Sequence, residues 1–243
     1  MSFESSLESR TGSEFKIQNS KFNIVEMTDH ASRYIPAAGH DFFTPLYDPL
    51  VRLLMRERTY RDRCFEQADI HPGHRVLDLG CGTGTMAVLV QQRVPGVTMI
   101  GVDGDPKILE IARRKAAKAS VSIQFDEAKA DRLPYTDASF DRVMSSLVLH
   151  HLTHEDKLAA LREVRRVLVA RGSFHLADFG PPIGRYAAFV SRFASHGDRL
   201  GENTAGSLPA LLREAGFARV RDRGYHNTLF GTLGLLSADR EQR

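Results

Sequence analysis

Three glycines and an aspartate lie close together in residues 76–84, which read V-L-D-L-G-C-G-T-G. The apolar residues of Val76–Leu79 predict a buried strand, and glycine at positions 80, 82 and 84 predicts a tight turn into a helix. Glycine tolerates positive φ in such a turn and lets a ligand approach the backbone. A carboxylate beside a helix N-terminus would repel a phosphate group. Asp78 therefore indicates a ligand that carries positive charge.

A second acid ends the next predicted strand, Val97–Asp103, and it follows Gly80 by 23 positions. An acid about 20 residues beyond such a glycine turn reaches a ribose hydroxyl. S-adenosylmethionine fits both acids, because it presents an ammonium and a sulfonium next to an adenosine. A nicotinamide cofactor is disfavoured, because Thr85 stands where a dinucleotide fingerprint requires Gly or Ala. Asp103 also lies at the entry to the helix that begins at Pro106, so a structural role as its cap stays open.

The same motifs resemble those of the class I S-adenosylmethionine-dependent methyltransferases. The resemblance runs from about Val76 to Gly180 and includes G-V-D at 101–103, L-P-Y at 133–135, S-F-D-R-V-M-S-S at 139–146 and R-G-S-F-H-L-A-D-F-G at 171–180. It is nearest to the bacterial subset that contains the ubiquinone and menaquinone C-methyltransferases and the phospholipid N-methyltransferases. The resemblance implies an α/β fold: a Rossmann-like, seven-stranded, mostly parallel sheet with helices on both faces and an antiparallel last strand.

The resemblance also implies which residues bind the cofactor. The methionine end would contact Asp78 and the loop residues Gly80, Cys81, Gly82, Thr83 and Gly84, and the ribose would contact Asp103 and Gly104. Related enzymes carry an aspartate before L-P-F that binds the adenine amino group, but here Lys129 replaces it. Ala130 keeps its backbone N–H, and Asp131 is an alternative acid. Ser145 and Ser146 follow the fourth strand and are expected to line the cleft near the methyl group.

Candidate catalytic residues follow the fourth and fifth predicted strands. Methyl transfer requires no triad, because the cofactor brings its leaving group already activated. A general base is needed only where the acceptor must lose a proton. His150 and His151 are candidates for that base, with Asp178 as a further candidate, and a purely structural role is equally open. No metal is expected, because the histidines at 150, 151 and 154 have no further ligand at a useful spacing.

The methyl acceptor is expected to lie under two segments, residues 34–47 and 186–193. Their aromatic and polar residues would line its pocket: Tyr34, His40, Phe42, Phe43, Tyr47, Tyr186 and Phe189. The alternative is that these residues only pack a lid onto the core. Arginines 185 and 192 accompany the aromatic residues of the second segment, a combination typical of peripheral contact with an anionic membrane.

Composition describes a globular protein with a nearly balanced charge. The chain has 243 residues, of which 33 are Lys or Arg and 30 are Asp or Glu, so the net charge is +3. This balance does not indicate a dedicated nucleic-acid binder. The two cysteines, Cys64 and Cys81, form no C-x-x-C motif. No apolar run approaches the roughly 18 residues of a membrane helix, and the N-terminus lacks the features of a signal peptide. We expect a cytoplasmic protein with a small-molecule or lipid-like substrate.

Composition and hydrophobic pattern divide the chain into three expected parts. They are a flexible tail at 1–22, a helical N-terminal lid at 23–70, and a methyltransferase domain at 71–243 with a helical insert at about 181–203. Apolar runs predict strands at 75–80, 97–103, 121–127, 140–147 and 173–179, and a closing hairpin of strands at 218–225 and 227–236. Helices are predicted at 85–94, 106–118, 155–169 and 208–217. Alternating strands and helices predict a parallel sheet whose ligands bind at the carboxyl ends of the strands.

Two other functions stay open. A nucleic-acid methyltransferase would use the basic run Arg113–Lys118, although the D/N-P-P-Y motif of amino-directed enzymes is absent. A non-catalytic S-adenosylmethionine-binding subunit is the other alternative, to which Lys129 gives slight support. Neither the accepting atom nor the oligomeric state is fixed by the sequence, and a homodimer is compatible with it.

Overall fold

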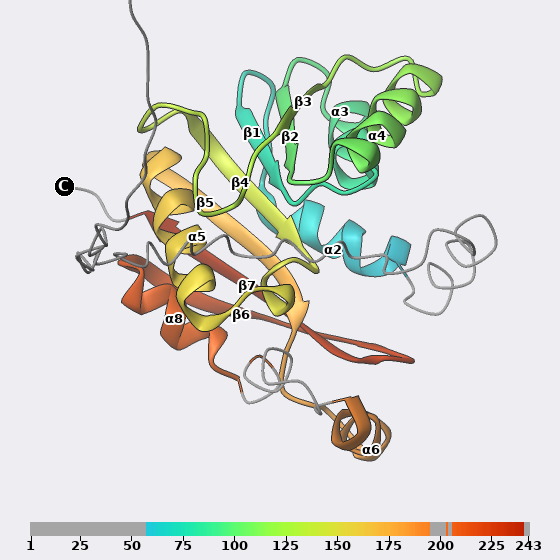
Figure 1. The fold of residues 1–243 in the computed structure, drawn as a ribbon, viewed down its shortest axis with the longest axis vertical. Helices are drawn as coiled ribbons and strands as arrows, with labels where there is room; N and C mark the ends of the chain where they lie inside the picture. Colours follow the sequence, from blue (N-terminus) through green and yellow to red (C-terminus); the bar gives the residue numbers. More distant parts are fainter. Residues whose placement is uncertain (1–56, 195–202, 204–205, 241–243) are drawn as a thin grey trace, which may run out of the picture. The chain divides into compact units, whose positions relative to one another are not determined.

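A computed structural model of the chain describes residues 57–194, 203 and 206–240, all within the second of the two units of the chain, residues 34–243. Its centre is a seven-stranded sheet in the order β3-β2-β1-β4-β5-β7-β6 (Figure 1). The strands are β1 (Arg75–Leu79), β2 (Thr98–Asp103), β3 (Gln124–Glu127), β4 (Phe140–Ser146), β5 (Leu168–Phe179), β6 (Phe217–Thr228) and β7 (Gly231–Arg240). Only β7 runs antiparallel to its neighbours. The expected architecture, with an antiparallel last strand, is confirmed.

Helices cover both faces of this sheet. They are α2 (Glu57–Ala68), α3 (Thr85–Arg93), α4 (Pro106–Lys118), α5 (His154–Val167), α6 (Arg185–Ala194) and α8 (Leu208–Glu214), with a short 3₁₀ helix, η1 (Leu149–His151). One apolar core joins the sheet to α2, α3 and α4, and a second joins it to α5 and α8. Val76 belongs to the first core and Leu77 to the second, because successive strand residues point to opposite faces. The continuous apolar run of β1 reflects burial on both sides.

The last helix of the region expected as a helical lid is α2, and it packs on the sheet. Its residues Tyr60, Cys64 and Ala68 are spaced four apart, so they lie on one helix face, and all three are buried in the first core. The rest of the expected lid, residues 23–56, and the expected tail, residues 1–22, lie outside the described residues.

Several predicted boundaries differ from the structure. The predicted helix 155–169 ends two residues earlier, and β5 begins directly after it at Leu168 instead of Ser173. Phe140 pairs with Leu168 while Arg142 pairs with Ser173, so the early part of β5 contains a bulge that local sequence does not reveal. The closing hairpin exists as predicted, but β6 runs three residues beyond its predicted end, and β7 lies four residues later in the chain than predicted. β7 pairs with both β5 and β6, and this long-range pairing fixes its bounds.

The helical insert is represented by α6, while residues 195–202 and 204–205 lie outside the described part. Among the described helices, none combines the length and the apolar character that crossing a membrane requires.

Candidate functional site

The glycine turn after β1 adopts the backbone conformation that its sequence predicts. Gly80, Gly82 and Gly84 have φ values of 65°, 53° and 72°, and Gly84 caps the start of α3. A Cβ at Gly80 would lie 2.3 Å from Cγ2 of Val148, so this position also requires the small residue for packing. A Cβ at Gly82, in contrast, would meet none of the described atoms within 4 Å. The turn therefore packs tightly at Gly80 and is open at Gly82.

Asp78 is buried just before this turn, with only 2% of its surface exposed. Its Oδ2 atom has no hydrogen-bond partner among the described residues. Burial raises the pKa of Asp78 to about 7; the positive charge of Arg61 opposes this shift and the negative charge of Asp103 adds to it. A buried carboxylate with an unpartnered oxygen is costly, and a cation placed against it removes that cost.

Asp103, at the end of β2, ties the glycine turn to the next loop. Its Oδ2 accepts a hydrogen bond from the Gly82 N–H at 2.9 Å, and its Oδ1 accepts one from the Asp105 N–H at 3.0 Å. Each carboxylate oxygen has a second lone pair that remains for a ligand hydroxyl. The cap of α4 is Asp105, whose side chain accepts from the Lys107 N–H at 2.9 Å, so the capping role considered for Asp103 belongs to Asp105. Gly104 lies in the half-buried loop between them.

Lys115 of α4 holds the far side of the turn, which the sequence did not reveal. Its Nζ donates to the hydroxyls of Thr83 at 2.6 Å and Thr85 at 2.7 Å. The Thr83 side chain, expected at the cofactor, is thus directed toward α4. The Cys81 N–H donates to the Val102 carbonyl at 2.9 Å, and burial raises the pKa of its thiol, so Cys81 serves as a neutral packing residue.

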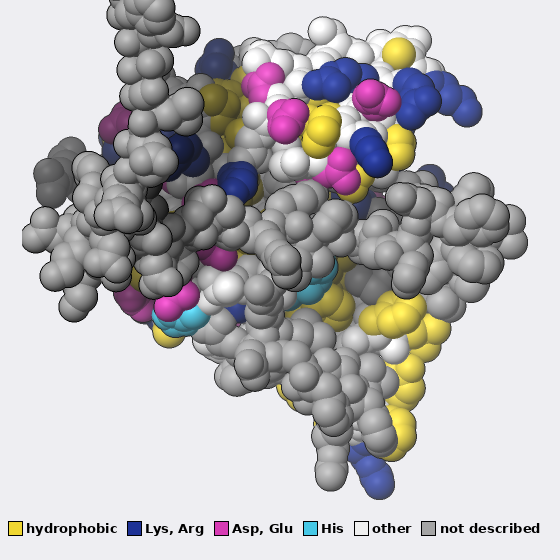
Figure 2. All heavy atoms as spheres, in the orientation of Figure 1, with side chains coloured by type: hydrophobic (Ala, Val, Ile, Leu, Met, Phe, Trp, Pro, Cys, Tyr) yellow, Lys and Arg dark blue, Asp and Glu magenta, His cyan; other side chains and the backbone are white. Residues whose placement is uncertain are grey.

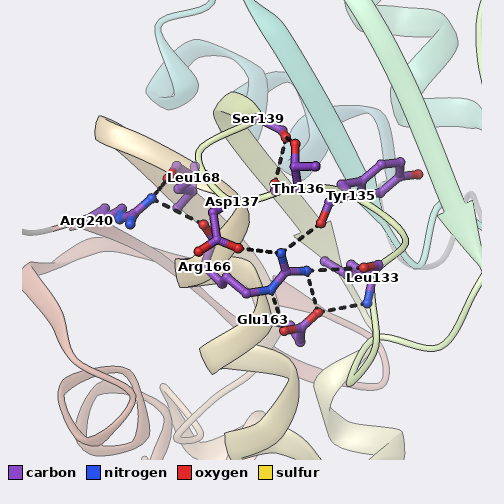
Figure 3. A network of polar contacts seen from close by, with 9 residues as sticks. All are labelled: Leu133, Tyr135, Thr136, Asp137, Ser139, Glu163, Arg166, Leu168 and Arg240. Carbon is purple, nitrogen blue, oxygen red and sulfur yellow. Dashed lines mark hydrogen bonds and ion pairs between the residues drawn. The ribbon is translucent and has the colours of Figure 1, made fainter.

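The loop between β3 and β4 carries the residues expected near adenine. Lys129 is exposed and Ala130 is half-buried against the second core. Arg166 of α5 fixes this loop by donating to the backbone carbonyls of Leu133 and Tyr135 at 3.2 and 2.8 Å, as Figure 3 shows. Glu163 pairs with Arg166 at 2.7 Å and accepts from the Leu133 N–H at 2.9 Å. The anchoring of this loop depends on residues about 30 positions away, which no local motif marks.

Ser145 and Ser146 take different positions at the end of β4. Ser145 is buried, and its hydroxyl donates to the Leu79 carbonyl at 3.0 Å, which ties β4 to β1. Its hydroxyl is therefore committed to the sheet. Ser146 is half-buried at the strand end. The next residue, Leu147, has a φ of 59°, which is strained for a branched side chain and turns the chain sharply.

That turn places backbone N–H groups around Asp178 at the end of β5. Asp178 is fully buried, and its Oδ2 accepts from the N–H groups of Val148 at 3.2 Å and Leu149 at 2.7 Å. Its Oδ1 accepts from the Phe179 N–H at 2.7 Å and lies 2.8 Å from Nδ1 of His150. Burial alone would raise the pKa of Asp178, but His150 and these hydrogen bonds hold it below its ordinary value. Asp178 is an ionised residue that positions His150.

His150 is held as one tautomer by this contact. The ionised Asp178 carboxylate can only accept a hydrogen bond, so it accepts one from the Nδ1–H group of His150. The proton of a neutral imidazole therefore lies on Nδ1, and Nε2 keeps a free lone pair. No described residue bonds Nε2. The ring is 4.9 Å from Phe179 and 3.9 Å from His151, measured between centroids. The arrangement is that of a general base oriented by a carboxylate, and His151 is the exposed neighbour.

Comparison with known proteins shows which family the chain belongs to. The model of a methyltransferase domain family matches residues 76–172. A demethylmenaquinone methyltransferase of Deinococcus radiodurans is 36% identical over 219 residues, which is 81% of this chain and 88% of that enzyme. The chain belongs to the class I S-adenosylmethionine-dependent methyltransferases.

Other relatives agree with this assignment. The ubiquinone/menaquinone biosynthesis C-methyltransferase UbiE of Xanthomonas campestris is 34% identical to this methyltransferase, over 70% of this chain and 75% of that one. At the level of the fold alone, the solved structure of the YcgJ protein from Bacillus subtilis superposes with a TM-score of 0.62 at 22% identity, covering 76% of this chain and all of that chain. The comparisons lend no support to the nucleic-acid or non-catalytic alternatives.

The residues present fit the cofactor of this methyltransferase. The unpartnered Oδ2 of Asp78 provides a buried negative site for the ammonium, and the open face of Gly82 admits a ligand to the backbone. Asp103 lies on the adjacent strand, one residue beyond Val102, which pairs with Leu79. Asp78, the backbone of Gly80–Gly84 and Asp103 would therefore hold S-adenosylmethionine at the carboxyl ends of β1 and β2.

The residues expected to line the acceptor pocket are only partly described. Tyr34, His40, Phe42, Phe43 and Tyr47 lie outside the described residues. Tyr186 and Phe189 lie on α6 and are 55% and 61% exposed. The Tyr186 hydroxyl donates to the Leu229 carbonyl at 3.0 Å, which joins α6 to the β6–β7 turn. Within the described ranges, no three His, Cys, Asp or Glu residues are grouped as a metal site.

Proposed function

We propose that this methyltransferase transfers the methyl group of S-adenosylmethionine to a hydroxylated aromatic ring with a lipid-like tail, and that His150 takes the proton of the acceptor. The observation that carries the proposal is the Asp178–His150 pair, with its 2.8 Å contact and free Nε2, at the strand ends next to the cofactor residues. Relatives named for demethylmenaquinone and for ubiquinone and menaquinone biosynthesis support an acceptor of this class.

The chemistry of such an acceptor requires a base. A phenolic hydroxyl is a weak nucleophile, and losing its proton makes both its oxygen and the adjacent ring carbons strongly nucleophilic. His150 would take that proton at Nε2, while Asp178 stabilises the imidazolium that forms. S-adenosylmethionine supplies an electrophilic methyl group on a sulfonium. Phe179 packs edge-on against the His150 ring and helps to hold its orientation.

The experiment is a labelled-methyl assay with two matched acceptors. One is a reduced, short-chain demethylmenaquinone, and the other is the same ring with both hydroxyls converted to methyl ethers, which has no acidic proton. We expect transfer to the first acceptor alone, and NMR of the product identifies the accepting atom. Equal transfer to the capped ring, or transfer only to phosphatidylethanolamine or RNA, would overturn the proposal.

The base is tested with a matched pair of variants. His150→Gln should lose activity by about 10²–10⁴-fold, the usual contribution of a general base. His151→Gln changes the exposed neighbour and should lose far less. Equal losses in the two variants would remove His150 from the proposed role.

We also propose that the apolar residues around α6 and the β6–β7 turn contact the lipid surface from which such an acceptor would come. Figure 2 shows hydrophobic side chains gathered where α6 and the hairpin lie in Figure 1, with a basic side chain nearby. The exposed residues, between 41% and 61% accessible, are Ile183, Tyr186, Phe189, Leu229 and Phe230. Large exposed apolar groups of this kind support contact with a membrane or partner.

Flotation with phosphatidylglycerol vesicles tests this contact. The double variant Phe189→Ser/Phe230→Ser should lose binding, whereas Ile111→Ser removes an exposed apolar residue of α4 and should not. Concentration-dependent sedimentation that the double variant abolishes would instead assign these residues to a homodimer. We propose a cytoplasmic location on the same basis, because such a protein would contact the membrane surface from one side.

A further inference from the structure

A cavity lies at the ends of the strands opposite to those that carry the cofactor residues. Its volume is about 550 Å³. It is lined by the end of α2, the early residues of β4, β5 and β6, and the last residues of β7, which runs the other way. Asp78, Asp103 and Asp178 all lie at the far ends of their strands, so the cavity is separate from the site described above.

The sheet register explains why this face is polar. Arg142 pairs with Ser173, which pairs with Asp239, and His175 pairs with Ser237, which pairs with Arg221. Further along the same strands, the corresponding face carries Met144, Ala177 and Leu235, which belong to the first apolar core. A period of two keeps each set on one side of the sheet. On this face of the sheet, the apolar core therefore ends before the cavity, and polar residues occupy the strand positions that line it.

Positive charge dominates the lining. Six arginines face two carboxylates, those of Asp69 and Asp239; the arginines are Arg142, Arg171, Arg219, Arg221, Arg223 and Arg240. Asp239 is already paired with Arg221 at 3.1 Å, and Asp69 with His71 at 3.1 Å. The two aspartates of the lining therefore leave most of the positive charge of the six arginines unbalanced.

Four of these guanidinium groups have no carboxylate partner in the part of the chain that the structure describes. Arg142 donates to the backbone carbonyl of Ala68 at 2.7 Å, and Arg223 donates to the Ser237 hydroxyl at 2.8 Å. Arg240 donates only to backbone carbonyls, and Arg171 makes no hydrogen bond to a described residue. Neutral partners hold Arg142, Arg223 and Arg240 in place, and the charge of all four side chains stays available.

Two residues of the cavity lining carry buried polar atoms without partners among the described residues. His175 is 4% exposed and lines the cavity, and its Nε2 lies 2.8 Å from the Ser173 hydroxyl. Its Nδ1 has no partner among the described residues, and neither does the side-chain amide of Gln67. Burial, with the charges of Arg142 and Arg223, lowers the pKa of His175 to about 3. Unpartnered buried groups beside uncompensated arginines are typical of a binding site without its ligand.

We propose that this cavity binds a small anion that carries phosphate groups. Guanidinium groups recognise phosphate oxygens through paired, charge-assisted hydrogen bonds, and several of them around one hollow favour a polyvalent anion over a single carboxylate. The volume suits a ligand of the size of a diphosphate or a sugar phosphate. In the bound state, small side-chain rotations would let the buried Nδ1 of His175 and the Gln67 amide add neutral hydrogen bonds. The site is independent of the methyl-transfer reaction proposed above.

Calorimetric titration of the full chain with inorganic pyrophosphate, in a buffer without phosphate or sulfate, tests the proposal. We expect saturable binding at one site, weakened at least tenfold in Arg171→Gln/Arg223→Gln. Arg114→Gln removes an equally positive, exposed side chain from α4 and should change the affinity less than twofold. Binding of S-adenosylhomocysteine should be unchanged in all variants, which shows that they are folded.

Further experiments distinguish a free phosphate compound from a lipid headgroup as the ligand. Vesicles of phosphatidylcholine with phosphatidic acid present the same chemistry as a lipid headgroup, and loss of vesicle binding in the double variant would assign the site to that headgroup. His175→Leu keeps the bulk without the ring nitrogens and should weaken pyrophosphate binding without lowering the melting temperature. Absence of binding to both probes, or weakening by Arg114→Gln as large as that of the double variant, would overturn the proposal.

Discussion

His150 and Asp178 form a fixed pair in which the Nδ1 and Oδ1 atoms lie 2.8 Å apart. The same carboxylate accepts the N–H groups of Leu149 and Phe179 at 2.7 Å each. The pair therefore links the turn after β4 to the end of β5, and rotation of the imidazole would break its contact with a carboxylate that backbone N–H groups hold in place.

Asp178→Asn should reduce kcat by about 10²–10⁴-fold with a smaller effect on KM, because the imidazole loses its orienting anion. The measurement is steady-state kinetics at saturating acceptor, beside a thermal melt of the variant. An unchanged kcat with a lowered melting temperature would show that Asp178 only supports the fold.

The same carboxylate should make stability depend on pH. The folded pKa of Asp178 lies below its ordinary value, so its contribution is present above the unfolded pKa of about 4 and is lost as pH falls through the folded pKa. Urea unfolding of the wild type and Asp178→Asn should therefore differ most near neutral pH and converge in acid. A difference that grows as the pH falls would contradict this sign.

Cofactor affinity should rise with pH through the ionisation of Asp78. Its pKa is about 7 in the free protein, and a bound ammonium requires the charged form. Affinity for S-adenosylhomocysteine should increase about tenfold from pH 6 to pH 8, the change in the charged fraction of a group with that pKa. The measurement is calorimetry at several pH values, and Asp78→Asn should show a flat profile.

Gly80→Ala should destabilise the protein by about 2–4 kcal/mol, because it adds both a positive-φ penalty and a steric clash. The new Cβ would lie 2.3 Å from Val148 Cγ2. Adding Val148→Ala should remove the clash and recover part of the loss, while the backbone penalty stays. The measurement is a double-mutant cycle of unfolding free energies, and strict additivity of the two substitutions would contradict the contact.

Arg166→Gln should lower the unfolding free energy by about 2 kcal/mol, since it removes charge-assisted hydrogen bonds to Glu163 and to two loop carbonyls. It should also weaken cofactor binding, because the loop that carries Lys129 and Ala130 loses its anchor. Arg162→Gln removes an exposed charge from the same helix and serves as the control. Equal effects of the two substitutions would show that the network contributes nothing.

The parts of the site that the sequence predicted are local. Asp78, the glycine turn and Asp103 follow directly from apolar runs that end in an acid, because the end of a parallel strand and the start of the next loop are adjacent in the chain. The cap of α5 is equally local, because Thr153 directly precedes the helix and its hydroxyl accepts the Asp156 N–H at 3.2 Å.

The parts that the sequence did not predict depend on distant partners. Thr83 turns toward Lys115, which is 32 residues away, and Ser145 donates to a carbonyl of β1, 66 residues away. Neither partner is visible without the sheet order. The arginine cavity is also invisible locally, because its charges are spread over four strands and meet only through the register of β4, β5, β6 and β7.

The most direct measurement compares S-adenosylhomocysteine with adenosine in calorimetric titrations of Asp78→Asn and Asp103→Asn. Asp78→Asn should weaken S-adenosylhomocysteine by tenfold or more, about 1.4 kcal/mol, and leave adenosine nearly unchanged, because adenosine has no ammonium. Asp103→Asn should weaken both ligands, because both carry the ribose. Equal affinities of the wild type and Asp78→Asn for S-adenosylhomocysteine would contradict the assignment of Asp78 as the ligand of the cationic end.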